Sequence, residues 1–489
     1  MPLRTPELLC RALPRLVPSQ LVCRQCLLRQ QPRVAPSRVL RPLRPGRLPP
    51  HVRYASSESA SSAVSSQARF SRFFTSSAVP TPAAAGVAAQ AAARAFPETS
   101  SRSVAYWLIG SAASVFGIVV FGGLTRLTES GLSITEWRPV TGSLPPVTEA
   151  DWESEFEKYR ASPEFRMLNS HMDLDEFKKI YYMEWTHRLW GRFVGLSFVL
   201  PAVYFVARRR VSPRTAAHLF GISALIGFQG FIGWWMVKSG LRDDLFAPGS
   251  HPRVSQYRLA THLAAAFVCY SWMLLAGLRI LRTHRLLADP AVASKAIEAL
   301  KNPVIAPFRR SVAALTVLVF VTVLSGALVA GLDAGLIYNE FPMMGVGLTP
   351  PRSELWDKFY SRREDGSDLW WRNLLENPSL VQLDHRILAT TTFCAVLALF
   401  AYSRTGRIAA VLPRNAKKGT TGIVHLVCLQ VALGITTLIY MVPISLAAAH
   451  QAGSLALLTG VLVLGHRLRV PKSTLAIVQK RLASTAKLR

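Results

Sequence analysis

Eight apolar windows of about 20 residues recur along this chain of 489 residues, and they limit its fold more than any other feature. About 20 residues is the length that an α-helix needs to cross a hydrocarbon core roughly 30 Å thick. The chain is 50% hydrophobic and 17% charged, with a mean hydropathy of +0.25, which is too apolar for a soluble domain. The sequence therefore predicts an all-α membrane protein with eight transmembrane helices. The windows are residues 104–124, 185–207, 216–237, 257–280, 311–332, 380–402, 421–442 and 444–465.

The amino-terminal segment has a different composition from the rest. Residues 1–97 contain 14 Arg, no Lys and only two acidic residues among many Ser, Ala and Pro. This composition is typical of a mitochondrial transit peptide. Because much of the net charge of +29 belongs to this leader and to loops between the windows, we expect no nucleic-acid partner.

Basic segments between the windows predict how the chain is oriented. "ARRRVSPR" (207–214) after the second window and "HRLRVPK" (466–472) after the eighth fall on the same side. By the positive-inside rule that side is the mitochondrial matrix. We therefore expect a multi-pass protein of the inner membrane with both termini in the matrix, and a basic matrix tail at 467–489.

The chain also repeats itself. "GGLTRLTESGLSITEW" (122–137) follows the first window, and the similar "GALVAGLDAGLIYNEF" (326–341) follows the fifth, 204 residues later. "QGFIG" (229–233) in the third window matches "QVALG" (430–434) in the seventh, 201 residues later. Similarity in the same order predicts a duplication. We expect two pseudo-symmetric four-helix bundles, at 104–281 and 310–466.

Four histidines lie near one membrane face, one in each even-numbered window. They are His187, His262, His385 and His450. Two facing helices with one inward histidine each are what bis-imidazole ligation of a haem iron requires. A single membrane histidine also fits an interhelical hydrogen bond, but repetition in both halves favours haem. Zinc is disfavoured, because no Cys or carboxylate cluster completes a tetrahedron.

One carboxylate accompanies the first histidine. In "EWTHRLWGR" (184–192), Glu184 precedes His187 by three residues and so lies on the same helix face. The corresponding position 198 residues later is Gln382. An ionisable group beside only one haem suits proton transfer during an oxidation. The alternative is an ion pair between Glu184 and Arg188 at the membrane surface.

Four arginines lie near the same face as the histidines, and they are Arg126, Arg188, Arg192 and Arg386. Haem propionates need cationic or hydrogen-bonding partners, which a guanidinium provides. Extension of these side chains to lipid headgroups is the competing interpretation. Nearby, "TEADWESEFEKYRASPEFRML" (148–168) predicts a short amphipathic helix over the bundle mouth with solvated acids.

Several of these features together resemble one known family. "GGLTRLTESGLSITEWRPVTGSLPP" (122–146), "EWTHRLWGR", the paired histidines and the eight spans are similar to the haem A synthase family, in its mitochondrial form that serves cytochrome c oxidase assembly. The resemblance covers roughly residues 100–470. Some bacterial relatives have a cysteine pair in the first external loop, whereas this chain has no Cys between residues 125 and 183.

The resemblance implies a role for each half. His187 and His262 would hold the substrate haem O, His385 and His450 would hold a haem b, and Glu184 would be needed for turnover. The implied activity is oxidation of a methyl group of haem O to a formyl group by successive hydroxylations, which yields haem A.

Partners also follow from the resemblance. It implies an electron donor such as ferredoxin, and haem O synthase, oxidase assembly factors and a second copy of the chain as further partners. A di-haem b-type electron-transfer cytochrome and a transporter are the alternative functions. Glu184, which has no carboxylate counterpart in the second half, favours the enzyme.

Overall fold

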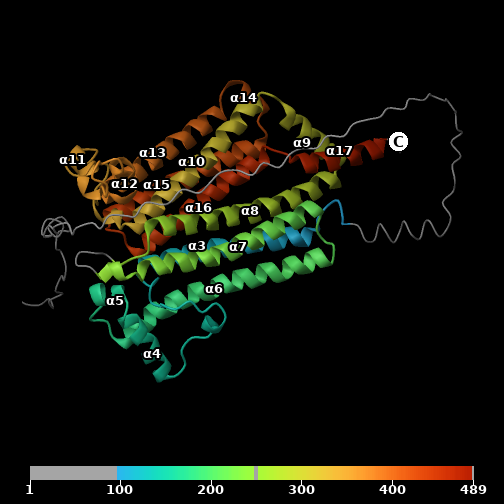
Figure 1. Cartoon of the computed structure of the whole chain (residues 1–489). Coiled ribbons are helices and arrows are strands. Elements are labelled where there is room, and N and C mark those ends of the chain that lie inside the picture. The colour runs from blue at the N-terminus through green and yellow to red at the C-terminus, as the bar shows by residue number, and fades with distance from the viewer. Residues whose placement is uncertain (1–95, 247–251, 487–489) are drawn as a thin grey trace, which may run out of the picture. The chain divides into compact units, whose positions relative to one another are not determined.

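The computed structural model describes residues 96–246 and 252–486, which are helical with no β-strand among them (Figure 1). Eight of the helices are long and apolar enough to cross a membrane, so the predicted all-α fold with eight spans is confirmed. The predicted leader lies almost wholly outside the described residues. The eight helices are α3 (Arg102–Leu127), α6 (Leu174–Ala207), α7 (Pro213–Gly240), α8 (Gln256–Ala288), α10 (Ile305–Gly331), α13 (Pro378–Tyr402), α15 (Arg414–Ile439) and α16 (Ile444–Arg467).

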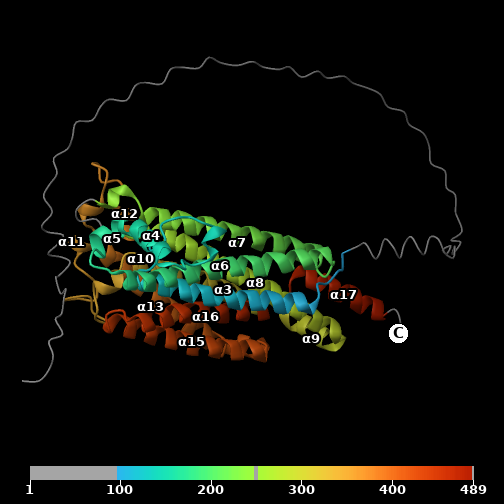
Figure 2. The ribbon, with the colours of Figure 1, turned by 90° about the horizontal axis from the view of Figure 1, so that it is seen from below.

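The long helices pack in two groups of four. In the first half α3 contacts α6 and α8, and α7 contacts both α6 and α8, which closes a ring. In the second half α10 contacts α13 and α16, and α15 contacts both α13 and α16. Between the groups α8 contacts both α10 and α16, and α3 contacts α16, as Figures 1 and 2 show. This arrangement supports the two-bundle prediction, although pseudo-symmetry of the halves stays a prediction.

Short helices gather at the two ends of the bundle (Figures 1 and 2). At the end that we call the loop end, α4 (Glu149–Arg160) contacts α6, and α11 (Arg352–Leu355) and α12 (Leu369–Glu376) contact α13. At the opposite tail end, α9 (Pro290–Lys301) and α17 (Lys472–Ala486) contact α8. The remaining short helices are α5 (Pro163–Leu168) and α14 (Gly406–Val411).

Helix α6 begins earlier than its apolar window. The window starts at residue 185, whereas the helix starts at Leu174, because Asp173 caps it by accepting a hydrogen bond from the Glu176 backbone N–H (2.8 Å). No Gly or Pro interrupts the polar residues between 174 and 184. The extra turns project beyond the apolar segment and pack against α4.

The predicted single helix over the bundle mouth is in fact two helices. Thr148 forms a capping box with Asp151 and starts α4, and Ser162 with Pro163 starts α5 after a break. Their apolar faces pack on the extended part of α6, where Phe156 and Tyr159 stack against Phe177. The prediction of one continuous helix was wrong, because Ser-Pro is both a stop and a start signal.

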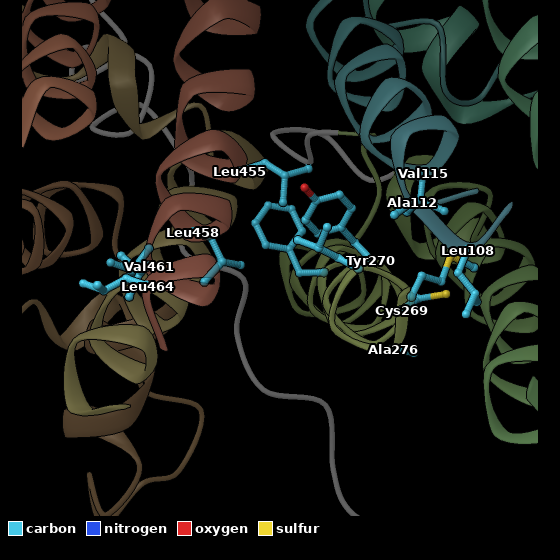
Figure 3. Packing of buried hydrophobic residues seen from close by; sticks show 14 of the residues in the cluster. Leu108, Ala112, Val115, Cys269, Tyr270, Ala276, Leu455, Leu458, Val461 and Leu464 are labelled. Carbon is cyan, nitrogen blue, oxygen red and sulfur yellow. The ribbon is translucent and has the colours of Figure 1, made fainter. Parts of the chain in front are cut away.

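A close-packed core joins the two halves. Figure 3 shows Leu108 and Val115 of α3 beside α8, and Tyr270 of α8 facing Leu455 of α16. Within lipid, such van der Waals contacts and interhelical hydrogen bonds hold helices together, because lipid chains are as apolar as the side chains. Tyr270 also shares a hydrogen bond with Thr459 of α16 (2.7 Å).

The first and last spans are linked as well. Helix α16 contacts α3, and the Gln451 amide donates to the Val119 carbonyl (2.9 Å). Helix α16 therefore belongs to the second ring and at the same time covers the first.

Candidate functional site

The four predicted histidines lie in α6, α8, α13 and α16, all toward the loop end of the bundle. His385 and His450 face each other with ring centres 6.5 Å apart and ring planes at 85°. Two imidazole nitrogens bound to one metal at roughly 2.0–2.1 Å place their ring centres about 6 Å apart. The geometry of this pair therefore fits bis-imidazole ligation of one iron. Among the described residues, no group of three or more His, Cys, Asp or Glu could hold a metal ion.

Each of the four rings packs against a glycine of the neighbouring helix. A methyl group added at Gly122 would lie 2.8 Å from Cε1 of His187, and at Gly326 it would lie 3.0 Å from Cε1 of His385. The same holds for Gly233 against His262 (3.5 Å) and for Gly434 against His450 (2.9 Å). The glycines thus let the imidazoles lie directly against the adjacent backbone. All four stand in the repeated segments, which was the available signal, but their role was not predicted.

Two glutamines hold the helices that carry the second histidine of each half. Gln229 donates to the His262 carbonyl (3.1 Å), and Gln430 donates to the His450 carbonyl (2.9 Å). They are the first residues of the matched segments "QGFIG" and "QVALG". The repeat therefore pairs both the residues and their contacts.

The Nδ1 atoms of the histidines differ between the halves. Nδ1 of His385 lies 2.8 Å from Oγ of Ser325, and Nδ1 of His450 lies 3.1 Å from the Gln430 amide nitrogen. In the first half, buried Nδ1 of His187 and of His262 has no hydrogen-bond partner within residues 96–246 and 252–486. Residues behind a metal ligand orient it and tune its basicity, so this difference would distinguish the two halves if the histidines bind iron.

Glu184 is buried, with 3% of its surface exposed, and four donors contact its carboxylate. Ser133 Oγ (2.7 Å) and the Ile134 N–H (2.8 Å) donate to Oε2, and Arg188 Nε (3.0 Å) and NH2 (2.7 Å) donate to Oε1. The ion pair with Arg188 exists, but it is buried rather than at the surface. Since every contact is a donor and the contacts reach both oxygens, they fix the position and orientation of the carboxylate. Ser133 and Ile134 were not predicted, because about 50 residues separate them from Glu184 in sequence.

The same loop contacts recur in the second half. Arg188 donates to the Ile134 carbonyl (2.7 Å), and Arg386 donates to the Tyr338 carbonyl (3.1 Å). Tyr338 follows Ile134 by 204 residues, and Arg386 follows Arg188 by 198. Gln382 donates to this Tyr338 carbonyl (3.0 Å) and is buried, with 3% exposure. Gln382 thus takes the structural place of Glu184 but carries no ionisable group.

The predicted propionate partners bind protein groups. Arg188, Arg192 and Arg386 donate to loop carbonyls, a role that the sequence did not suggest. Arg126 pairs with Asp333 of the second half (2.9 Å). Three nitrogens still have no hydrogen-bond partner in the part of the chain that the structure describes, and these are Nε of Arg126, NH1 of Arg192 and Nε of Arg386. Such buried donors fit an anionic ligand, so propionate binding stays a prediction.

Asp333 links the halves at the loop end. Besides Arg126, Arg253 contacts its carboxylate at 2.6 Å, so one acid bridges two arginines of the first half. Asp333 has a left-handed backbone (φ 48°), as does Glu129 (φ 52°), its partner in the predicted repeat. An Asp tolerates this conformation better than most residues.

One acid in the loop-end helices is buried. Glu164 of α5 is 4% exposed and accepts a hydrogen bond from the Tyr159 hydroxyl (3.4 Å), which itself accepts one from Asn169 (2.8 Å). Burial, with the nearby carboxylates of Glu184 and Glu129, raises the pKa of Glu164 to about 8. The prediction that the acids of 148–168 are solvated is therefore wrong for Glu164.

Comparison with known proteins gives one consistent result. The family model described as "Cytochrome oxidase assembly protein" matches residues 105–462. The chain is 55% identical to heme A synthase COX15 of Saccharomyces cerevisiae over 375 residues, which is 76% of this chain and 77% of that protein. It is 43% identical to heme A synthase COX15 of Homo sapiens over 385 residues, 77% of this chain and 85% of the human protein.

A third relative is a fusion of two proteins. The chain is 52% identical to the heme A synthase-mitochondrial ferredoxin fusion protein of Schizosaccharomyces pombe over 377 residues. The match covers 75% of this chain and 60% of the fusion.

Proposed function

The chain belongs to the family of cytochrome oxidase assembly proteins that includes the heme A synthases, and from that membership we propose that it oxidises a methyl group of haem O to the formyl group of haem A. It is an oxidoreductase of a mitochondrial membrane that it crosses eight times. The proposal extends to the inner membrane, with both termini in the matrix, because the basic segments lie at the tail end.

The observation that carries the mechanistic proposal is the position of Glu184. It lies one helical turn before His187, buried among four donors, and its counterpart Gln382 cannot ionise. We assign the substrate haem O to the first half, with His187 and His262 as its ligands. Glu184 accepts a proton there during the oxidation, and Ser133 and Arg188 hold the carboxylate in place.

His385 and His450 are assigned to a resident haem b in the second half. Their ring separation of 6.5 Å fits a shared iron, and Gly326 and Gly434 leave room for the rings. When bound, this group would supply reversible one-electron chemistry. The chain's own contribution is to hold the two imidazoles edge to face and to place an amide, Gln382, rather than a carboxylate one turn before His385, as suits electron transfer.

A ferredoxin is the proposed electron donor. The fission yeast relative is a natural fusion of a heme A synthase with a mitochondrial ferredoxin, which supports electron transfer between two such proteins. Haem O synthase, oxidase assembly factors and a second copy of the chain remain proposed partners on the family resemblance alone.

Pigment extraction from the purified full-length protein tests the proposal. We expect haem B together with haem O or haem A, because a resident group and a substrate or product should both be present. Haem B alone would instead indicate an electron-transfer cytochrome, and absence of any haem would refute both haem sites.

A further inference from the structure

The two halves differ in the residue behind their first histidine. In the second half, the Ser325 hydroxyl donates to the Thr322 carbonyl (2.7 Å) and lies 2.8 Å from Nδ1 of His385. With the hydroxyl proton directed to that carbonyl, Ser325 is left as the acceptor for Nδ1–H of His385. The tautomer of His385 is therefore the one with an unprotonated Nε2, which is the atom that a metal can bind.

The first half has apolar residues at every matched position. Ser325 and Thr322 follow Phe121 and Ile118 by 204 residues. Thr392, which shares a hydrogen bond with Thr322 (2.8 Å), follows Val194 by 198 residues. A polar strip in one half thus corresponds to an apolar strip in the other.

Phe121 stands at the position in the first half that Ser325 has in the second half. Its ring lies parallel to His187, with ring centres 6.4 Å apart and planes at 7°. Nδ1 of His187 is left with no hydrogen-bond partner in the described chain. The Phe121 ring accepts no conventional hydrogen bond from Nδ1 of His187. It therefore fixes neither the tautomer of the imidazole nor its rotation about the Cβ–Cγ bond.

Retention of a haem depends on the hydrogen bonds that fix its histidine ligands. Loss of a hydrogen-bond acceptor behind a metal-bound histidine typically lowers metal affinity about 10- to 100-fold. A resident cofactor needs a ligand that stays fixed, whereas a substrate has to enter and its product has to leave. The environments of His385 and His187 match these opposite requirements.

We propose that Ser325 is a positioning residue that holds His385 for a retained haem, and that Phe121 leaves His187 unanchored so that the first half can release its haem product. This inference rests on the proposed assignment of the resident haem to the second half and the substrate to the first. Position 121 of α3 and position 325 of α10 would thus distinguish release of a haem from its retention.

A purely structural role for Ser325 makes a different prediction. Serine side chains often bond to a carbonyl one turn earlier in the same helix, as Ser325 does to Thr322. If that were its whole role, Ser325→Ala would alter protein stability but not the properties of the bound haem.

The first test uses the full-length, haem-loaded protein. Ser325→Ala should speed transfer of haem B to apomyoglobin by about 10- to 100-fold, raise the midpoint potential of the remaining haem B, and shift its low-spin ferric resonance signal. Ser325→Thr should restore wild-type values, because it keeps the hydroxyl. Ser311→Ala is the matched control, since Ser311 of α10 is exposed and bonds only to the Pro307 carbonyl (3.3 Å) among its described contacts.

The second test transplants the contact. A methyl group added at Gly122 or at Gly326 would lie at a similar distance from Cε1 of the facing histidine, 2.8 and 3.0 Å. Because the two helix pairs approach each other equally closely, we expect a serine at position 121 to reach Nδ1 of His187 as Ser325 reaches Nδ1 of His385. Phe121→Ser should slow release of haem A to an acceptor protein at least several-fold, whereas Phe121→Ala should not.

The outcomes separate this inference from the proposed function. One outcome is that the wild-type protein contains haem B, but Ser325→Ala leaves the haem transfer rate, the midpoint potential and the resonance signal unchanged. That outcome would overturn the inference and leave the proposed function standing. A wild-type protein without haem B would refute the resident site, and the inference with it. If Phe121→Ser fails to fold, the comparison of Ser325→Ala with Ser325→Thr still decides.

Discussion

Replacement of Glu184 by Gln is the most direct test of proton transfer, and the structure allows its cost to be worked out. The wild-type carboxylate has two oxygens, each with two donors. A Gln side chain can direct its one oxygen to Arg188 or to Ser133 and Ile134, but its NH2 group then faces the other donors.

The expected stability loss follows from those contacts. A hydrogen bond to a charged group contributes about 1.5–3 kcal/mol, and removing one partner of a buried ion pair costs about 3–5 kcal/mol. Because the Arg188 side chain is 15% exposed, we expect a loss near the lower end, about 3 kcal/mol. A surface pair would cost only about 0–1 kcal/mol.

The effect on catalysis should be larger than the loss of folded protein explains. Proton transfer by a positioned side chain contributes about 10²- to 10⁴-fold to rate. We therefore expect haem A formation per mole of folded, haem-loaded protein to fall at least about 100-fold, with haem O or a partly oxidised product accumulating. The assay is haem extraction and chromatographic quantification, normalised to haem B.

Ser133→Ala is the matched control. It removes one donor at 2.7 Å from the same carboxylate but leaves the charge, so it should lower stability by about 1.5–3 kcal/mol and change activity only a few-fold. Normal activity per loaded molecule in Glu184→Gln, or an equal loss in Ser133→Ala, would refute the catalytic role and leave Glu184 as a structural partner.

Three further predictions concern the haem ligands, the loop end and the junction of the halves. His385→Ala or His450→Ala should abolish the haem B absorbance while the protein still inserts, and unaltered haem B content in either variant would contradict that pair. The folded-state pKa of Glu164, about 8, lies above the ordinary carboxyl value of 4.5, so its contribution to stability is complete below pH 4.5 and is lost as pH rises to 8. Thermal melting should therefore occur at lower temperature at pH 8.5 than at pH 5, and Glu164→Gln should remove that slope. Asp333→Asn keeps a side chain that tolerates a φ of 48° but removes a charge that is 22% exposed, so it should cost about 1–3 kcal/mol at low salt and less at roughly 1 M salt. A melting difference that does not depend on salt would argue against the ion pairs.

The sequence predicted the spans well and their extensions poorly. Hydrophobic length is a property of a local window, so all eight spans could be located. The early start of α6 at Leu174 depends on a cap and on packing of α4, and neither contributes to hydropathy. The break between α4 and α5 was visible as Ser162-Pro163 but was not used.

The repeat in the sequence indicated which site residues lie at corresponding places in the two halves. The repeat pointed to His385 and His450, whose rings lie edge to face with centres 6.5 Å apart, and their role as ligands stays a prediction. Partners brought by distant loops could not be found, because no periodicity links Ser133 to Glu184 or Asp333 to Arg126. The burial of Glu164 was missed for the same reason.

The contact between the first and last spans has a consequence for how the protein is made. Synthesis proceeds from α3 to α16, so the face of α3 near Val119 stays uncovered until Gln451 is present. The Tyr270 hydroxyl likewise has no Thr459 to bond with until α16 has been made. A product truncated before α16 would expose both sites to lipid, even with all four helices of the first half present. The first half therefore completes its packing only after the last helix has been made.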